Sequence, residues 1–298
     1  EPTRGTSEKL RRLNEELATA WLAIADDGDL VWTPSPIDEG FFSRAVEEGL
    51  PNVVPVTSFN GLSGDVECVP WGWSSDIQEI VERHGWRSNA PALRSVLAAN
   101  SRATSFELER RWNVGLSGAT RIESLEQLDD AIRKLPANRD SILTSDDSQD
   151  IGGKSIASDP TNSIRGRGIR WVVKAEFGMS ARERILGTGT PTVADANWIR
   201  KRLALSGAVF FEPWVDRIGE VGIQIDIPTA GEPQLIGMTP MLVDPRGQYS
   251  GSWFAFDDSR FTAERRFWSR AIDVALDAAK YLRSIGYFGP LGIDSMIY

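Results

Sequence analysis

The sequence predicts a mixed α/β protein in which an α/β lobe precedes a strand-rich α+β region. With 298 residues, the chain exceeds one ordinary domain and fits two or three compact lobes. Hydrophobic residues make up 41% and charged residues 25%, which is the balance of a soluble globular protein. Strand and helix patterns alternate near the N-terminus, whereas strand patterns dominate after residue 168.

The first lobe is expected over residues 1–98. Its apolar patterns predict a helix over 8–25, strands over 29–34 and 53–57, and helices over 37–48 and 77–84. Strand, helix and strand at this spacing are typical of a parallel α/β unit. Ser74 or Ser75 is placed to cap the last of these helices.

The second lobe is expected over residues 99–215. Its elements are a helix over 101–113 that ends at Gly115, a strand over 119–122, a helix from Ser124, a strand over 169–177, a helix through Trp198 and a strand over 208–215. Ser124 and Gln127 have the spacing of a capping box. Residues 137–168 are rich in Ser, Asp, Asn and Gly, which predicts a long loop or insertion.

The third lobe is expected over residues 216–298. Strands are predicted over 220–227 and 234–243, with 248–256 pairing to the latter, followed by a helix over 262–285 and a strand over 292–298. The sequence stops inside this apolar strand with no turn or cap, so we expect the natural chain to continue beyond Tyr298.

Composition excludes several classes of function. A net charge of −9 leaves no basic footprint for nucleic acid, and no stretch approaches the ~20 apolar residues of a membrane helix. Cys68 is the sole cysteine, which excludes an internal disulfide and fits a cytoplasmic location. His84 is the sole histidine, and its place at a helix end favours a capping role. Catalysis is therefore expected to use carboxylates, lysines, arginines and a bound cation.

Lys174 lies on an apolar strand just before a loop of small residues. A lysine on a rigid strand supplies a point charge, and a Gly/Ser loop offers backbone N–H groups, so the pair suits phosphate. The alternative is a solvated edge-strand lysine followed by an ordinary hairpin turn. The loop contains Gly178, Met179 and Ser180.

Three other segments place acids on apolar strands. Glu212 precedes a proline at a strand end, a hinge that can present backbone groups to a purine. Residues 219–227 alternate, with Glu220, Gly222, Gln224 and Asp226 sharing one face. Asp294 lies within the last apolar strand, where magnesium bound to phosphates would serve as its partner. Taken singly, each could equally be a solvated or hydrogen-bonded acid.

Other phosphate-binding motifs fail. Gly153-Lys154-Ser155 resembles the end of a Walker A loop, but Ser148 stands where its first glycine belongs. A protein kinase needs a histidine heading its catalytic loop, and His84 precedes Lys174. A dinucleotide fingerprint is absent, because prolines follow the first strand.

The order of these features resembles the ATP-grasp superfamily, in particular its D-alanine–D-alanine ligase and carboxylate–amine ligase branches. The resemblance covers residues 96–298, and residues 1–95 are similar in general design to the lobe that precedes the ATP-grasp fold. The motifs are short, so the resemblance depends on their order and spacing. It implies an ATP-grasp fold with an N-terminal α/β lobe.

The resemblance also implies roles for individual residues. Arg102 and Lys174 would bind the nucleotide phosphates, and Gly178, Met179 and Ser180 would form the loop that closes over them. Glu212, Trp214 and Val215 would surround the adenine, and Glu220 would bind the ribose. Asp294 would bind magnesium. Glu220 lies one residue farther along than its counterpart in the D-alanine ligases.

Two departures from the family pattern concern the metal site. Family members usually carry a basic residue two positions before the magnesium-binding Asp, and here that residue is Gly292. Members also continue into a strand with Glu-x-Asn, which would follow Tyr298.

The implied activity is an ATP-dependent ligase that joins a carboxylate to an amine through an acyl phosphate, with ATP and Mg²⁺ as cofactors. Many members of the family are dimers, so the resemblance also allows a homodimer. Arg246 is a candidate to hold the substrate carboxylate, with an exposed turn arginine as its alternative. A nucleotide-binding module without catalysis and an ATP-grasp-type kinase are the alternative functions. Lys174→Ala is expected to abolish Mg-ATP binding and leave stability nearly intact.

Overall fold

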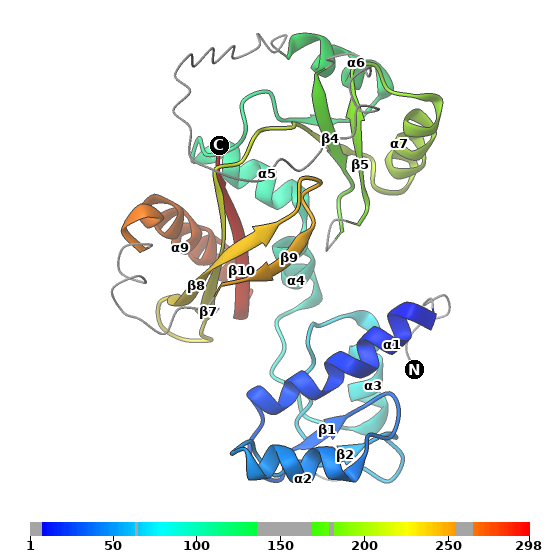
Figure 1. Cartoon of the computed structure of the whole chain (residues 1–298), viewed down its shortest axis with the longest axis vertical. Helices are drawn as coiled ribbons and strands as arrows, with labels where there is room; N and C mark the ends of the chain where they lie inside the picture. Colours follow the sequence, from blue (N-terminus) through cyan, green and yellow to red (C-terminus); the bar gives the residue numbers. More distant parts are fainter. Residues whose placement is uncertain (1–7, 63–64, 136–168, 179–181, 254–264) are drawn as a thin grey trace, which may run out of the picture. The chain divides into compact units, whose positions relative to one another are not determined.

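The structure is a computed structural model, and it describes residues 8–62, 65–135, 169–178, 182–253 and 265–298. The loop predicted over 137–168 lies outside these ranges. The chain divides into two compact units, of which the first contains residues 1–71 and 75–89 and the second contains 72–74 and 90–298. Figure 1 labels the elements of both units.

The first unit contains a two-stranded parallel sheet. Its elements are α1 (Glu8–Leu17), the 3₁₀ helix η1 (Ala18–Ala23), β1 (Leu30–Trp32), α2 (Glu39–Glu47), β2 (Val54–Val56) and α3 (Ser75–His84). β1 and β2 pair in parallel with α2 between them in sequence, as the alternation of patterns predicted. The predicted single helix over 8–25 instead changes to 3₁₀ geometry at Ala18. Leu22, Val31, Ala45 and Val53 form the buried core.

His84 lies at the end of a helix, as predicted, and its ring packs among aromatic side chains. It is the last residue of α3, and its ring stacks on Trp86 with 4.7 Å between centroids. Phe59 lies edge-on to the same histidine at 6.0 Å. The imidazole therefore belongs to a small aromatic cluster.

The second unit begins with α4 (Leu93–Asn100), which the sequence did not predict. The buried Ser95 hydroxyl donates a 2.7 Å hydrogen bond to the carbonyl of Ile285, at the end of a distant helix. This bond ties α4 to the second unit, so the boundary near residue 89 precedes the end predicted for the first lobe. The division of the sequence into three lobes stays a prediction.

One sheet of the second unit has the strand order β3-β6-β4-β5, and all its pairs are antiparallel. The strands are β3 (Thr120–Ile122), β4 (Arg170–Lys174), β5 (Arg184–Thr188) and β6 (Val209–Pro213), accompanied by α5 (Arg102–Arg111), α6 (Leu125–Lys134) and α7 (Val193–Ser206). Residues of α6 and α7 pack with one sheet face in a core that includes Trp171, Val173, Ile199 and Phe211.

Side-chain caps start two helices where the sequence placed them. The Ser101 hydroxyl accepts from Thr104 at the start of α5, and Ser124 accepts from Gln127 at the start of α6. The end of α5 differs from the prediction: the helix stops at Arg111, before Gly115. Asn113 adopts a φ of 53° and turns the chain there, because asparagine tolerates the left-handed region.

The other sheet of the second unit has the order β10-β7-β8-β9, again antiparallel. Its strands are β7 (Gly219–Ile227), β8 (Gln234–Val243), β9 (Tyr249–Ser252) and β10 (Gly289–Ile297), and α9 (Ser269–Ser284) covers one face (Figure 1). The alternate apolar residues of β7, from Val221 to Ile227, are almost fully buried against α9. The opposite face carries the polar residues of β7, as the alternation predicted.

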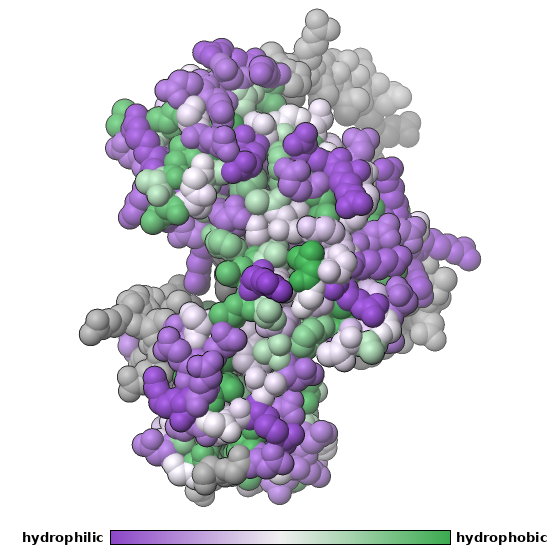
Figure 2. Space-filling view, turned by 180° about the vertical axis from the view of Figure 1, so that it is seen from behind, coloured by the Kyte–Doolittle hydropathy of each residue, from purple (hydrophilic) through white to green (hydrophobic). Residues whose placement is uncertain are grey.

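Among the helices of the described ranges, none is long and apolar enough to cross a membrane. Hydrophilic residues cover most of the face seen in Figure 2, and hydrophobic residues appear as smaller groups between them. Such groups are ordinary on a folded domain.

Candidate functional site

Lys174 and Glu212 form an ion pair on one face of the sheet that contains β4. Val172 lies opposite Glu212 in the register, so Lys174 lies diagonally across from Glu212 on the same face. The Lys174 Nζ atom is 2.5 Å from Glu212 Oε2, and the two side chains are 24% and 18% exposed. Because water reaches this pair only in part, it is a stronger contact than a surface ion pair.

Helix α5 lies over this face of the sheet. The Phe106 and Phe210 rings are 5.7 Å apart, and Arg102, Phe106 and Glu109 share one side of the helix by their spacing. Burial raises the pKa of Glu109, the negative charge of Glu212 raises it further, and Lys174 and Arg102 lower it. The fold therefore brings Arg102, Lys174 and Glu212 together, and adds Glu109 to them.

The start of α5 is tied to the segment that follows Lys174. The Arg102 N–H donates to the Glu176 carbonyl at 3.1 Å, and the Ser101 hydroxyl donates to the Glu176 carboxylate. The Arg102 Nε atom is buried and has no hydrogen-bond partner within the described part of the chain. A buried donor without an acceptor fits an anion that would bind beside Lys174.

Gly178 begins the small-residue loop after β4. A Cβ atom at this position would lie 2.9 Å from the Arg182 carbonyl oxygen and 2.8 Å from the Glu183 Cβ, closer than atoms of a side chain can approach. Glycine is therefore required at position 178 by the close approach of Arg182 and Glu183. The other two predicted loop residues, Met179 and Ser180, lie outside the described residues.

The hinge after β6 is held by Arg217. The Trp214 N–H donates to the Arg170 carbonyl at 3.0 Å, and the Arg217 guanidinium lies over the Trp214 ring at 5.1 Å. Arg217 also pairs with Glu220 at 2.6 Å, and both side chains are largely buried. The predicted adenine and ribose residues Trp214 and Glu220, with Val215 beside Trp214 in sequence, are thus joined through one arginine.

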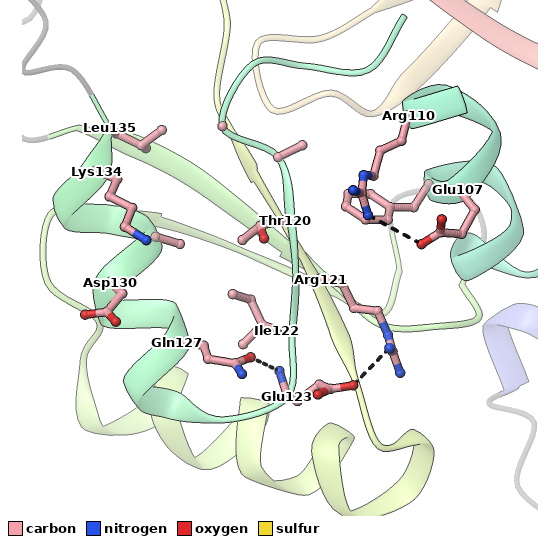
Figure 3. A pocket seen from close by; sticks show the side chains of 14 residues that line it. Glu107, Arg110, Thr120, Arg121, Ile122, Glu123, Gln127, Asp130, Lys134 and Leu135 are labelled. Atoms are coloured by element: carbon pink, nitrogen blue, oxygen red, sulfur yellow. Dashed lines mark hydrogen bonds and ion pairs between the residues drawn. The ribbon is translucent and has the colours of Figure 1, made fainter. Parts of the chain in front are cut away.

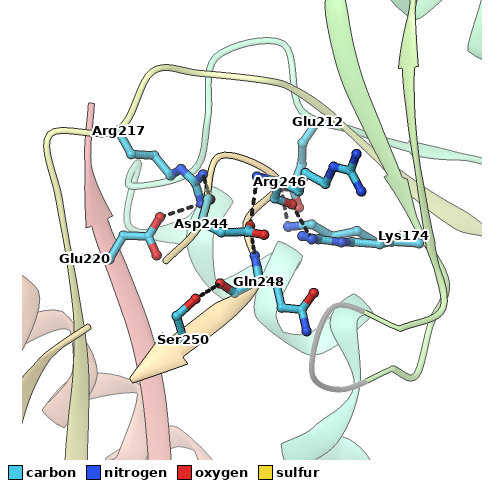
Figure 4. A network of polar contacts seen from close by, with 9 residues as sticks. Lys174, Glu212, Arg217, Glu220, Asp244, Arg246, Gln248 and Ser250 are labelled. Carbon is cyan, nitrogen blue, oxygen red and sulfur yellow. Dashed lines mark hydrogen bonds and ion pairs between the residues drawn. The ribbon is translucent and has the colours of Figure 1, made fainter. Parts of the chain in front are cut away.

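The turn between β8 and β9, residues 244–248, is tied to the same region. The Asp244 carboxylate accepts from the N–H groups of Arg246 at 2.8 Å and Gln248 at 2.7 Å, which fixes the turn. The Arg184 guanidinium donates to the Arg246 carbonyl, and Arg217 donates to the Asp244 carbonyl at 3.1 Å. Figure 4 shows this turn in one polar network with Lys174 and Glu212. The Arg246 residue itself is exposed.

Asp294 lies on the polar face of the other sheet. It pairs with Gly222 across β10 and β7, and its side chain points away from the α9 core while its neighbours Leu291 and Ile293 pack into that core. Burial of the carboxylate by the crowded strands raises the pKa of Asp294, although the residue keeps more than a third of its surface exposed. Within the described ranges, no three His, Cys, Asp or Glu side chains gather into a metal site. Asp294 fits a magnesium ion that takes its other ligands from phosphates and water.

A further groove lies away from these residues. It has a volume of about 710 Å³ and lies between α5, β3 and α6, where charged and apolar side chains alternate (Figure 3). Its charged residues include two neighbouring ion pairs, Arg110 with Glu107 and Arg121 with Glu123. None of the predicted nucleotide or metal residues lines it.

Four charged residues of the site were not found from sequence. Glu109 follows Arg102 at helical spacing, which is a usable signal, because two charged side chains on one helix face can serve one site. Arg184, Arg217 and Asp244 enter the site through strand pairing and turn geometry. No local pattern identifies them.

The chain matches no protein-family model and no curated protein. Among solved structures, the ADP complex of an N5-carboxyaminoimidazole ribonucleotide synthetase is similar over 96% of this chain and 64% of that one, with 14% identity and a TM-score of 0.50. This chain therefore spans less than two thirds of that synthetase.

Two further solved structures are similar at slightly lower scores. The N5-carboxyaminoimidazole synthetase of Staphylococcus aureus with ADP has 12% identity, coverages of 96% and 64%, and a TM-score of 0.49. The D-alanine–D-alanine ligase of Bacillus anthracis has 12% identity, coverages of 92% and 83%, and a TM-score of 0.48. The mixed α/β architecture and the match to the first synthetase identify the fold of this chain as the ATP-grasp fold.

Proposed function

We propose that this chain is the nucleotide-binding body of an ATP-dependent ligase that joins a carboxylate to an amine. The observation that carries the proposal is the placement of Lys174, Arg102 and Glu212 on one face of an antiparallel sheet in an ATP-grasp fold. The Lys174 ammonium and the Arg102 guanidinium, whose buried Nε–H has no hydrogen-bond partner among the described residues, are suited to a triphosphate. The ADP complex of the N5-carboxyaminoimidazole ribonucleotide synthetase, which has the same fold, is consistent with nucleotide binding by this chain.

The nucleotide would replace the ion pair between Lys174 and Glu212. Its phosphates would draw the Lys174 ammonium and Arg102, and the loop from Gly178 through Met179 and Ser180 would cover them. Glu212 would then accept from the adenine amino group, with Trp214 and Val215 beside the ring. Glu220 would bind the ribose after exchanging part of its contact with Arg217. Asp294 would hold a magnesium ion that neutralises phosphate charge.

The reaction follows from these positions. A substrate carboxylate oxygen attacks the γ-phosphorus, the bond to the β-phosphate oxygen breaks, and an acyl phosphate and ADP result. The amine then attacks the acyl carbon, phosphate leaves and the amine loses a proton. The protein's part is to position the reactants and to stabilise charge on the transferred group. Arg246, at an exposed turn, would orient the substrate carboxylate.

Release of ADP by the full-length protein tests this function. The protein is incubated with Mg-ATP and with mixtures of amino acids and other small carboxylates and amines. We expect ADP release to require a matching carboxylate and amine together, and hydroxylamine to trap the acyl phosphate as a hydroxamate when the amine is omitted. Arg200→Gln, an exposed change on α7, is the matched control. Equal ADP release with and without any substrate mixture would contradict the ligase.

A non-catalytic nucleotide-binding module is the second candidate. It is favoured by Gly292, which stands where the family pattern has a basic residue, and by the lack, within the described ranges, of any group of three His, Cys, Asp or Glu side chains that could hold a metal with Asp294. This candidate predicts tight binding of Mg-ATP with no turnover stimulated by any substrate mixture. A homodimer and a cytoplasmic location remain predictions for either candidate.

A further inference from the structure

Arg184 lies directly opposite Lys174 in the pairing of β4 with β5. Residues directly opposite in antiparallel strands have their side chains on the same face, so two cations lie side by side. Glu212 pairs with Lys174. Like charges directly opposite each other destabilise a sheet. An anionic ligand beside Arg184 would therefore reduce the repulsion between Arg184 and Lys174.

In the structure the hydrogen bond of the Arg184 guanidinium goes to a carbonyl, that of Arg246. A carbonyl accepts a hydrogen bond but does not neutralise a charge. Burial lowers the pKa of Arg184, Arg217 and Arg102 lower it further, and Asp244 and Glu212 oppose this. The guanidinium is therefore partly buried, and two other arginines as well as two carboxylates act on its charge.

The turn that Arg184 holds is packed against the predicted nucleotide hinge. A Cβ atom at Gly247 would lie 3.0 Å from both the Arg184 Nη1 atom and the Trp214 ring, and 3.2 Å from the Arg217 Nη1 atom. The tip of the turn thus lies against Arg184 and Trp214 together. Movement of Arg184 would free one of the two arginine contacts that hold the turn, because Arg217 still binds the Asp244 carbonyl.

We propose that Arg184 is a phosphate-binding residue of the nucleotide site, and that it exchanges the Arg246 carbonyl for a nucleotide phosphate. The exchange would loosen residues 244–248, the turn that carries Arg246, when ATP is bound. This inference rests on the proposed function, because it needs a nucleotide on the face that carries Lys174. A guanidinium forms two parallel hydrogen bonds to phosphate, so the exchange gains charge compensation as well as geometry.

Binding of nucleotides that differ only in phosphate tests the proposal. The full-length wild type, Arg184→Gln, Arg184→Lys and the control Arg200→Gln are titrated calorimetrically with Mg-ATP, Mg-ADP and adenosine. We expect Arg184→Gln to raise the Kd for Mg-ATP by about ten-fold or more and to leave the Kd for adenosine unchanged, because a charged hydrogen bond to phosphate is lost. Arg184→Lys should fall between Arg184→Gln and wild type, and Arg200→Gln should match wild type.

Unchanged Mg-ATP affinity in Arg184→Gln would overturn the proposal and leave the proposed function standing. Equal losses for adenosine and Mg-ATP would also overturn it, since they would show a structural effect. Failure of the wild type to bind Mg-ATP would overturn both. Hydrogen exchange supplies the second readout. The backbone amides of residues 246–248 of the wild type should exchange faster with Mg-ATP than without it. Unchanged or slower exchange would contradict the proposed change of hydrogen-bond partner at Arg184.

Discussion

Lys174 has a structural role that its place in the sequence does not reveal. From sequence, Lys174→Ala was expected to leave stability nearly intact, because a strand-end lysine looks solvated. The ion pair with Glu212 changes this expectation, because both side chains are mostly shielded from water. Removal of the ammonium deprives the Glu212 carboxylate of its direct ion-pair partner at a position that water reaches only in part.

We therefore predict that Lys174→Ala abolishes Mg-ATP binding and lowers the free energy of unfolding by about 1–3 kcal/mol. Urea denaturation measures the stability and calorimetry the binding. The exposed Lys201→Ala is the control and should change neither. Adding Glu212→Gln to Lys174→Ala should recover part of the lost stability. An unchanged free energy of unfolding in Lys174→Ala would mean that the ion pair of Lys174 and Glu212 does not stabilise the fold.

Asp294 gives a prediction with a defined pH dependence. Burial raises its pKa in the folded chain, whereas in the unfolded chain the value is about 3.9. The folded state then binds more protons than the unfolded state between the two pKa values, so the stability contributed by Asp294 falls as pH rises through that window. Asp294→Asn removes this loss.

Asp294→Asn is therefore expected to have a higher Tm than wild type at neutral pH, with the difference closing below about pH 4, near the unfolded pKa. Thermal unfolding followed by circular dichroism across this range measures it. The same variant should lose the magnesium dependence of ATP binding. A Tm below that of wild type at neutral pH would show that the Asp294 carboxylate stabilises the fold through an interaction that outweighs the cost of its burial.

At the scale of elements, the hairpin of β4 and β5 positions the site. β5 was not predicted, because the charged residues at 182–184 interrupt the apolar pattern at its start. Its pairing with β4 fixes the register that sets Arg184 against Lys174. The hairpin in turn depends on the fit of Gly187 over Trp171.

Gly187→Ala is expected to lower the free energy of unfolding by about 1–3 kcal/mol, because the core has no room for a methyl group there. A Cβ atom at Gly187 would lie 2.0 Å from the Trp171 ring, which is buried and anchored by a 2.7 Å hydrogen bond to the Gly189 carbonyl. Gly237→Ala is the matched control, since nothing lies within 4 Å of its Cβ position in β8. Equal stability of the two variants in urea would contradict the packing.

At the scale of the whole molecule, all the proposed nucleotide-binding residues lie in the second unit, within residues 90–298. Ligand binding stabilises the folded state, by about 2.7 kcal/mol at a hundred times Kd. We expect Mg-ATP to slow hydrogen exchange in the second unit, around Arg102, Lys174 and Glu212, and to leave residues 8–62 unchanged. Strong protection of the first unit by nucleotide alone would show that it contributes to the ATP site.

The sequence by itself determined the features that depend on neighbouring residues. Alternation placed the apolar side of β7 in the core and its acids on the opposite face, and the same period set Asp294 apart from Leu291 and Ile293. The capping spacing of Ser124 and Gln127 placed the start of α6. The order of the strand lysine, the hinge acid and the last aspartate indicated the ATP-grasp fold, which the match to a solved synthetase confirmed.

Only the tertiary structure decided which charges meet. The pairing of Lys174 with Glu212, the position of Arg184 beside them and the contacts of Arg217 all depend on strand register and on a turn that joins different strands. Periodicity gives the face on which a side chain lies, but the partner across the sheet is set by pairing between residues far apart in sequence. For that reason the arginines that surround the predicted lysine could not be found from the sequence.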